Sequence, residues 1–104
     1  MSDWIDAIPV EQLPAGGRWL VRRGGCEIAL FNIGGTIYAI DDSCPHNGAS
    51  LAGGRLEGAT VTCRAHGLRF DLGSGCMRGG AGLQVRTYPV RVQEGRIEID
   101  TTPA

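Results

Sequence analysis

The sequence contains no lysine, no long apolar run and no excess of charge of one sign. Its ten basic residues are all arginine and stand against eleven acidic residues, which gives a net charge of −1. A protein that binds nucleic acid usually carries a basic excess or a basic stripe, so this balance argues against such a partner. A membrane-spanning helix needs a run of about eighteen apolar residues, and because the sequence has none we expect no membrane partner.

The first residues also lack the pattern of a secretory signal peptide. Asp3 and Asp6 interrupt the place where a basic segment would be followed by an apolar one. We therefore expect a cytoplasmic protein. With 104 residues, the chain is long enough to bury one modest hydrophobic core and too short for two. The length predicts a single domain over residues 1–104.

No stretch of ten or more residues shows the apolar stripe of an amphipathic helix. Glycine is abundant instead, at 17 of 104 residues, against an average usage of roughly 7%. Apolar runs joined by the dipeptides Gly24-Gly25 and Gly34-Gly35 are typical of β-hairpins. These features predict an all-β fold, an antiparallel sandwich or barrel-like scaffold. The expected strands are 4–8, 18–22, 27–33, 36–40, 60–63, 68–72, 83–92 and 96–100, and Pro89 predicts an edge or a bulge in the seventh.

One region interrupts the strand pattern, from about residue 41 to about residue 82. It is dense in glycine, and we expect a subdomain built of loops and inserted into the strand scaffold. It also contains the two histidines of the chain, each close to a cysteine, in the motifs C-P-H (Cys44 and His46) and C-R-A-H (Cys63 and His66). Two thiolates and two imidazoles form a set of four ligands for a soft or borderline metal.

Two kinds of metal centre suit this set of ligands. Zinc binds two cysteines and two histidines tetrahedrally in structural sites. A [2Fe–2S] cluster takes two cysteines on one iron and two histidines on the other in the Rieske arrangement. A classical zinc finger has both cysteines in one pair and both histidines in the other, whereas each pair here runs cysteine then histidine. The mixed order favours the two-iron cluster and leaves zinc open.

The segment CPHNGASLAGG at 44–54, with CRAHGLRFDLGSG at 63–75, resembles the Rieske [2Fe–2S] signature, C-x-H followed by C-x-x-H. The likeness extends over nearly the whole chain, whose length matches the small Rieske ferredoxins of bacterial aromatic-ring dioxygenase systems. The resemblance implies the Rieske fold, with the loop-built subdomain binding one [2Fe–2S] cluster. It also implies that Cys44 and Cys63 hold the inner iron, and His46 and His66 the outer one.

The sequence departs from the family in two places, and from its high-potential members in a third. Arg64 and Ala65 stand where the family commonly has proline and then an aromatic residue or leucine. Residues 79–82, without proline, stand in for the loop that usually covers the cluster. Leu68 and Phe70 replace a serine and a tyrosine that donate hydrogen bonds to the cluster in high-potential relatives. Since hydrogen bonds to the sulfurs raise the reduction potential, the sequence predicts a low-potential centre.

Four further residues need an interpretation. Cys26 and Cys76 have no partner motif, and free cysteine commonly behaves as a small buried apolar residue, so we expect both in the core. Asp41 and Asp42 come just before the first motif. We expect them to be solvated or to cap a turn rather than to bind metal.

The ligand count also limits the function. A Rieske oxygenase needs a mononuclear iron, usually held by two histidines and a carboxylate, and the cluster already uses both histidines of this chain. We therefore expect a one-electron carrier, not an enzyme. The resemblance implies an NAD(P)H-dependent flavoprotein ferredoxin reductase as donor and a terminal oxygenase component as acceptor, with the carrier a monomer. Two alternatives stay open: the small Rieske-type subunit of an assimilatory nitrite reductase, and a structural zinc-binding interaction domain.

Overall fold

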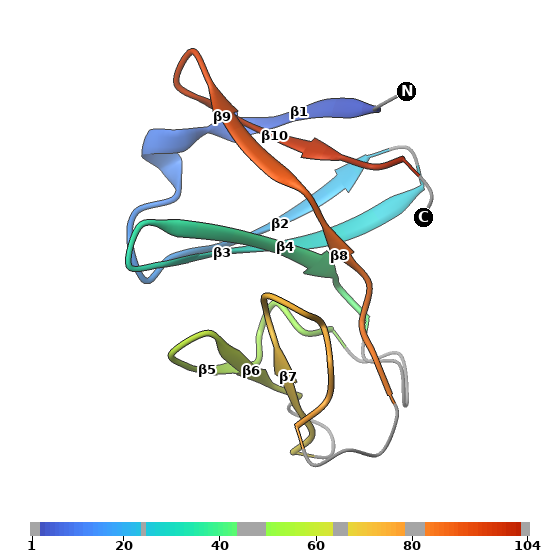
Figure 1. Ribbon diagram of the computed structural model, residues 1–104. Coiled ribbons are helices and arrows are strands. Elements are labelled where there is room, and N and C mark those ends of the chain that lie inside the picture. The colour runs from blue at the N-terminus through green and yellow to red at the C-terminus, as the bar shows by residue number, and fades with distance from the viewer. Residues whose placement is uncertain (1–2, 24, 44–49, 64–66, 79–82, 103–104) are drawn as a thin grey trace.

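The computed structural model describes residues 3–23, 25–43, 50–63, 67–78 and 83–102, and they form three antiparallel sheets (Figure 1). The first sheet has the order β1 (Trp4–Pro9), β10 (Arg96–Asp100), β9 (Val90–Gln93). The second has the order β2 (Arg18–Arg23), β3 (Cys26–Ile33), β4 (Thr36–Asp41), β8 (Thr87–Tyr88). The third has the order β5 (Arg55–Glu57), β6 (Thr60–Thr62), β7 (Arg69–Asp71), and a single 3-10 turn, η1 (Val10–Gln12), follows β1. The all-β antiparallel prediction is confirmed.

The second sheet lies between the other two, and β3 shows why (Figure 1). Successive side chains of a strand point to opposite faces. Ile28 and Leu30 lie in a first core with residues of the first sheet, whereas Ala29 and Phe31 lie in a second core with residues of the third sheet. The expectation of one core is therefore wrong, because the central sheet buries apolar side chains on both of its faces. Because both faces are covered, β3 reads as a continuous buried run instead of alternating with polar residues.

The hairpin between β3 and β4 follows from its two glycines. Gly34 and Gly35 both have positive φ, at 61° and 98°. A two-residue turn with positive φ at both positions has the twist that antiparallel strands require, and glycine adopts it without steric cost. The same geometry recurs between β9 and β10, where Glu94 and Gly95 have φ values of 53° and 75°.

Two strand predictions need correction. The segment 83–92 does not form one long strand, because Pro89 separates β8, which pairs with β4, from β9, which pairs with β10. Proline has no N–H for a ladder hydrogen bond, and here it stands where the chain passes from one sheet to another. β5 was not predicted, since its three residues R-L-E contain a single apolar position, which is too short a pattern to indicate a strand.

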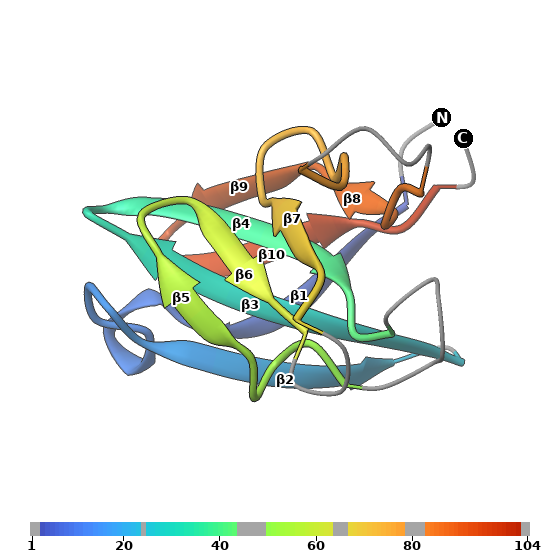
Figure 2. The same ribbon diagram turned by 90° about the horizontal axis from the view of Figure 1, so that it is seen from below.

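Seen from below, the third sheet lies over β3 and β4 of the second sheet (Figure 2), and its strand β6 leads directly into Cys63. Its three short strands all belong to the region predicted as a loop-built subdomain, about 41–82, and are joined by turns and longer connections. Across the described part of the chain, no helix has the length and apolar character needed to cross a membrane.

Candidate metal centre

Of the four predicted ligands, Cys63 lies within the described residues. Cys44, His46 and His66 lie outside them. Cys63 comes directly after β6 and is a free cysteine with 0% exposure. It lies in the second core, whose other buried members are apolar: Ala29, Phe31, Ile40, Leu51, Val61, Phe70, Leu72 and Val85. The chain thus places a thiol, a good ligand for a soft metal, where bulk water does not reach it.

A closed turn follows Cys63. The Cys63 N–H donates to the carbonyl of Leu68 at 2.7 Å, and the Gly67 N–H donates to the carbonyl of Cys63 at 2.9 Å. Gly67 has φ +70°, a conformation that side-chain-bearing residues rarely adopt. These bonds bring both ends of the segment that carries His66 next to the buried thiol. The glycine after the histidine is what permits so tight a return.

The segment that carries Cys44 and His46 is also closed at its base. The side chain of Asp42 is buried, with 6% exposure for the residue, and it accepts hydrogen bonds from Leu51 N–H and Ala52 N–H at 2.8 and 2.6 Å. These bonds join Asp42 to residues eight to ten positions later, so its carboxylate holds the returning chain and does not cap a local turn. The alternative that it is solvated is also wrong, because the returning chain covers it.

The return of the first segment lies directly beside the start of the second. A Cβ atom on Gly54 would lie 2.4 Å from the Thr62 carbonyl oxygen and 2.9 Å from Val61 Cγ2, so this glycine packs closely against β6. From β2, the Arg18 Nη1 donates to the carbonyls of Ala52 and Gly54 at 2.9 and 2.5 Å. The described residues therefore bring the bases of the two Cys-His segments together, just before Cys63. No local feature of the sequence indicated the contribution of Arg18 or Gly54.

A third connection, at residues 79–82, was predicted to cover the centre and lies outside the described residues. Its flanks are paired: Met77 N–H donates to the Leu83 carbonyl at 3.1 Å, and Val85 N–H donates to the Gly75 carbonyl at 2.8 Å. The backbone therefore brings both ends of this connection to the third sheet.

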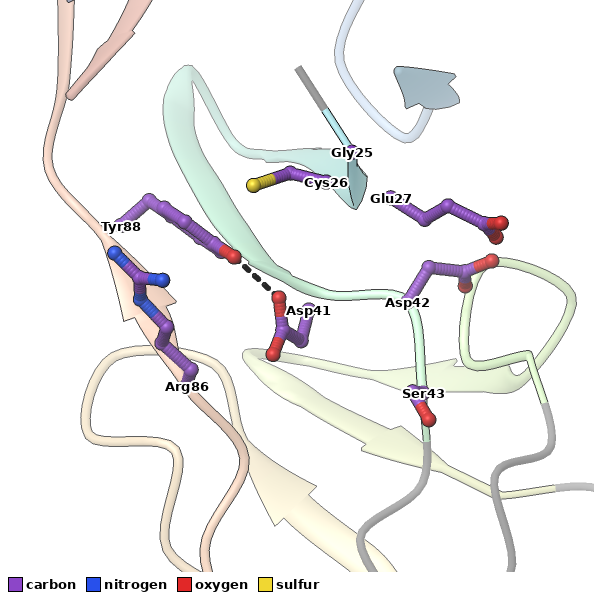
Figure 3. A pocket seen from close by; sticks show the side chains of 8 residues that line it. All are labelled: Gly25, Cys26, Glu27, Asp41, Asp42, Ser43, Arg86 and Tyr88. Atoms are coloured by element: carbon purple, nitrogen blue, oxygen red, sulfur yellow. Dashed lines mark hydrogen bonds between the residues drawn. The ribbon is translucent and has the colours of Figure 1, made fainter. Parts of the chain in front are cut away.

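A cleft of about 480 Å³ lies where β4 ends and the first segment begins (Figure 3). The Tyr88 hydroxyl donates to Asp41, and the guanidinium of Arg86 lies 4.3 Å from the centre of the Tyr88 ring. Burial, followed by the hydrogen bond to Asp41, raises the pKa of Tyr88 well above its usual value of 10. Asp41 N–H also donates to the Arg86 carbonyl at 2.9 Å. These contacts attach the start of the first segment to β8.

The remaining cysteines differ from each other. Cys26 is half-buried against the first core, which agrees with the predicted apolar packing. Cys76 is exposed, so its predicted place in the core is wrong. The chain turns after β7, and a single bridge between Cys76 and Gln84 holds Cys76 at the surface. All three cysteines of the described ranges are free, and these ranges contain no group of three or more metal-binding side chains.

The residues present fit a cluster with mixed sulfur and nitrogen ligands. Such a cluster needs thiolates in protected surroundings and imidazoles from the same loops. Cys63 supplies a thiol enclosed by apolar side chains, and the hydrogen-bonded bases of both Cys-His segments lie beside it. This arrangement of a β scaffold with two closed segments fits a protein that holds a metal centre between the segments.

Comparison with known families identifies the kind of metal centre. The chain belongs to the Rieske [2Fe–2S] domain family, which matches residues 3–89. The cofactor of this family is one Rieske-type [2Fe–2S] cluster. The fold and cofactor implied by the two motifs are thus confirmed.

Individual relatives match over nearly their whole length. The ferredoxin component of the naphthalene 1,2-dioxygenase system of Pseudomonas aeruginosa is 37% identical over 98 residues, covering 93% of this chain and 94% of the relative. A solved complex of reduced oxygenase and oxidised ferredoxin in carbazole 1,9a-dioxygenase contains a chain with a TM-score of 0.86 and 27% identity, covering 93% and 92% of the two chains. A structure of a proposed NADH-dependent nitrite reductase small subunit from Mycobacterium tuberculosis has a TM-score of 0.88 and 26% identity, covering 100% of this chain and 99% of that one.

Proposed function

We propose that this chain is a one-electron carrier of an aromatic-ring-hydroxylating dioxygenase system. It takes electrons from an NAD(P)H-dependent flavoprotein ferredoxin reductase and passes them to a terminal oxygenase component. The main support is the relationship over 93% of the chain to a protein named as the ferredoxin component of such a system. The solved carbazole dioxygenase complex, in which a similar ferredoxin is bound to its oxygenase, supports the same acceptor.

The proposed ligands are Cys44 and Cys63 on one iron and His46 and His66 on the other. Two features of the described residues support this assignment: the buried thiol of Cys63, and the hydrogen-bonded bases of both segments beside it. A bound cluster of this type accepts and returns one electron at a time. The task of the chain is to hold the ligands rigidly, keep water from the sulfur side and bring the histidine side to a partner.

The surroundings of the site favour a low potential. Leu68 is half-buried and Phe70 is fully buried, and neither side chain has a hydrogen-bond donor to offer a sulfur atom. Donors to the sulfurs stabilise the reduced form, which carries one more negative charge. A carrier without these donors gives up its electron more readily, which suits transfer to an oxygenase.

We propose that the chain is not itself the oxygenase, because the cluster uses both of its histidines. We further propose that it acts as a monomer in the cytoplasm, as expected for a carrier that visits two partners in turn. Size-exclusion chromatography of the oxidised protein tests the monomer, which should elute at 11.0 kDa.

A nitrite reductase small subunit is the second candidate, since one solved protein with that description matches the whole chain at a TM-score of 0.88. Rapid mixing separates the two functions. The reduced protein should be reoxidised by the terminal oxygenase of a naphthalene-type system and should not form a stable complex with a large sirohaem subunit. A stable complex with the sirohaem subunit, without electron transfer to the oxygenase, would establish the second candidate.

Spectroscopy tests the metal centre itself. Anaerobically purified protein should be red-brown and, after dithionite, should give the rhombic EPR signal of a Rieske centre. Cys63→Ser and His46→Ala variants should lose this signal, whereas the matched control Cys76→Ser, at an exposed position, should retain it. A colourless protein with one zinc per chain would refute the carrier and establish the structural zinc domain.

A further inference from the structure

Asp42 has an unusual environment for an aspartate that stands two residues before a proposed ligand. It is buried, and its carboxylate accepts hydrogen bonds from the chain that returns after the first Cys-His segment. The Ser50 Oγ lies 2.8 Å from each carboxylate oxygen and donates to them, while Leu51 N–H and Ala52 N–H donate to Oδ1 at 2.8 and 2.6 Å. We call this set of bonds, from Asp42 to Ser50, Leu51 and Ala52, the Asp42 clamp.

The clamp joins the two ends of one segment. Ser50 follows Asp42 by eight residues, and Cys44 and His46 lie between them in the sequence. Without the clamp, each end of the segment would still be attached to the fold, but the two ends would lose the hydrogen bonds that join them to each other. Buried hydrogen bonds to a charged carboxylate are stronger than neutral ones and are costly to break. The clamp is therefore suited to fix the distance between the two ends of the segment.

Further contacts fix the position of the clamp relative to the rest of the site. Asp42 N–H donates to the Glu27 carbonyl on β3 at 2.9 Å. On the other side of the clamp, the Leu51 side chain is fully buried in the second core together with Cys63. Gly54 N–H donates to the Leu51 carbonyl at 3.0 Å and closes the turn that packs on Thr62. The clamp thus connects the central sheet, the base of the first segment and the residue before Cys63.

The neighbouring aspartate has a different task. Figure 3 shows the Asp41 and Asp42 side chains pointing away from each other, with Asp41 hydrogen-bonded to Tyr88. Asp41 holds β4 to β8, two strands of the scaffold, and has no bond to the returning chain among those of the described residues. Of the two adjacent carboxylates, Asp42 is the one that acts on the ligand-bearing segment.

We propose that Asp42 is a positioning residue: through Ser50, Leu51 and Ala52 it sets the geometry in which the first Cys-His segment presents its ligands to the cluster. The inference rests on the proposed assignment of Cys44 and His46 as ligands. Asp42 itself does not touch the metal in this proposal. Removing the Asp42 carboxylate should weaken cluster binding and disturb the geometry of the centre without removing any ligand.

The test compares five proteins: the wild type and the variants Asp42→Ala, Asp42→Asn, Ser50→Ala and Asp71→Asn. Asparagine keeps one acceptor oxygen for the Leu51 and Ala52 amides and gains a donor for Ser50, so it tests geometry without charge. Asp71→Asn is the matched control, because Asp71 also closes a turn in this region. It accepts from Ser74 N–H and Oγ at 2.8 and 2.9 Å but encloses no proposed ligand.

Three readouts are measured: iron release to a chelator from the oxidised protein, the EPR spectrum of the reduced protein, and amide hydrogen exchange at Leu51 and Ala52. Asp42→Ala should release iron faster by roughly tenfold or more, the factor that corresponds to loss of one charge-assisted hydrogen bond. Its EPR lines should broaden, because the ligands no longer adopt one geometry, and the Leu51 and Ala52 amides should exchange faster. Ser50→Ala should give a smaller change of the same kind.

The Asp42→Asn variant distinguishes a geometric role of Asp42 from a role of its negative charge. Asp42→Asn should release iron close to the wild-type rate with sharp EPR lines, and Asp71→Asn should match the wild type in both. The proposal is overturned if Asp42→Ala behaves as the wild type, or if Asp71→Asn is impaired to the same degree. Should Asp42→Ala fail to fold, Ser50→Ala decides: wild-type iron release, EPR and exchange in this variant would overturn the proposal.

The same experiment separates failure of this proposal from failure of the proposed function. If the wild type gives no Rieske EPR signal, the ligand assignment is wrong, and with it the proposal that depends on it. If the wild type gives the signal and all variants share its iron release and line shape, the ligand assignment stands and the positioning role of Asp42 is wrong.

Discussion

Replacing Gly54 by alanine should destabilise the protein through one local overlap beside the metal site. The added Cβ would lie 2.4 Å from the Thr62 carbonyl oxygen, 2.9 Å from Val61 Cγ2 and 3.1 Å from the Leu51 carbonyl oxygen. Two of these three atoms are backbone atoms, of β6 and of the turn that Gly54 itself closes. A rotamer change therefore cannot relieve the overlap, and the turn must move away from the strand that precedes Cys63.

The size of the effect follows from these contacts. Overpacking of a well-packed site costs about 1–3 kcal/mol, and overlap with backbone puts Gly54→Ala near about 3 kcal/mol. Alanine restricts the unfolded chain more than glycine does and returns about 0.4–1 kcal/mol. The net loss is about 2 kcal/mol, which corresponds to a fall in Tm of about 8–16 °C for a domain of this size. Because the displaced turn also carries Leu51 and Ala52, the variant should bind less iron per chain.

The assay is thermal unfolding of the oxidised protein by circular dichroism, with iron measured per chain. The matched control is Gly73→Ala, whose Cβ would meet the Asp71 Oδ2 at 3.3 Å and Tyr38 Cε1 at 3.9 Å. Neither is a backbone atom, and a shift of a few tenths of an ångström lets Asp71 keep its bonds to Ser74, so the control should lose clearly less stability than Gly54→Ala, about 1 kcal/mol or less. A Gly54→Ala protein with wild-type Tm and iron content would refute the reasoning, because it would mean that the turn does not pack against β6.

Three other predictions concern the potential and the pH dependence. Protein-film voltammetry should give a reduction potential near the lower end of the Rieske range of roughly −150 to +300 mV. A wild-type potential well above zero would contradict the predicted low-potential centre. Phe70→Tyr should raise the potential if the new hydroxyl reaches a sulfur. Tyr88 has a raised pKa, so its ionisation favours the unfolded state: the stability that it contributes is complete below its usual pKa of 10 and is lost as the pH rises from there toward the folded value. Tyr88→Phe should flatten the loss of stability above pH 10 in denaturant titrations. An unchanged alkaline slope would show that burial and the hydrogen bond to Asp41 do not raise the pKa of Tyr88. Asp71 has a pKa lowered by hydrogen bonds from Ser74, first from its backbone N–H and then from its hydroxyl. The resulting stability is present above the usual value of 3.8 and lost as the pH falls through the lowered one, so Asp71→Asn should reduce the acid sensitivity of unfolding; equal acid slopes for the two proteins would count against this turn.

The local sequence determined the features that depend on neighbouring residues alone. Alternating and continuous apolar runs predicted most of the strands, because the side-chain period of a strand is a local property. Gly34 and Gly35 predicted the hairpin between β3 and β4, since positive φ is a property of single residues. The two Cys-His motifs predicted the family and its cofactor, because a loop that supplies two ligands must carry them close together in the chain.

The tertiary structure decided which residues are covered and by what. Pro89 looked like an irregularity within one strand, yet the chain changes sheets there, and only pairing with β4 and β10 makes this visible. Cys76 resembled a core cysteine and is exposed. Asp42 was expected to be solvated or to cap a turn, yet it is buried and its carboxylate is bonded to residues eight to ten positions later.

The contribution of Arg18 to the site shows the reason most clearly. Its guanidinium reaches the Ala52 and Gly54 carbonyls from a strand 34 and 36 residues earlier in the chain. Burial and hydrogen bonding are set by partners that are distant in sequence, and the local pattern of a residue does not reveal those partners. The sequence by itself therefore determined the family, its cofactor and most of the strands, while the packing of the sheets decided how the bases of the two Cys-His segments are held together.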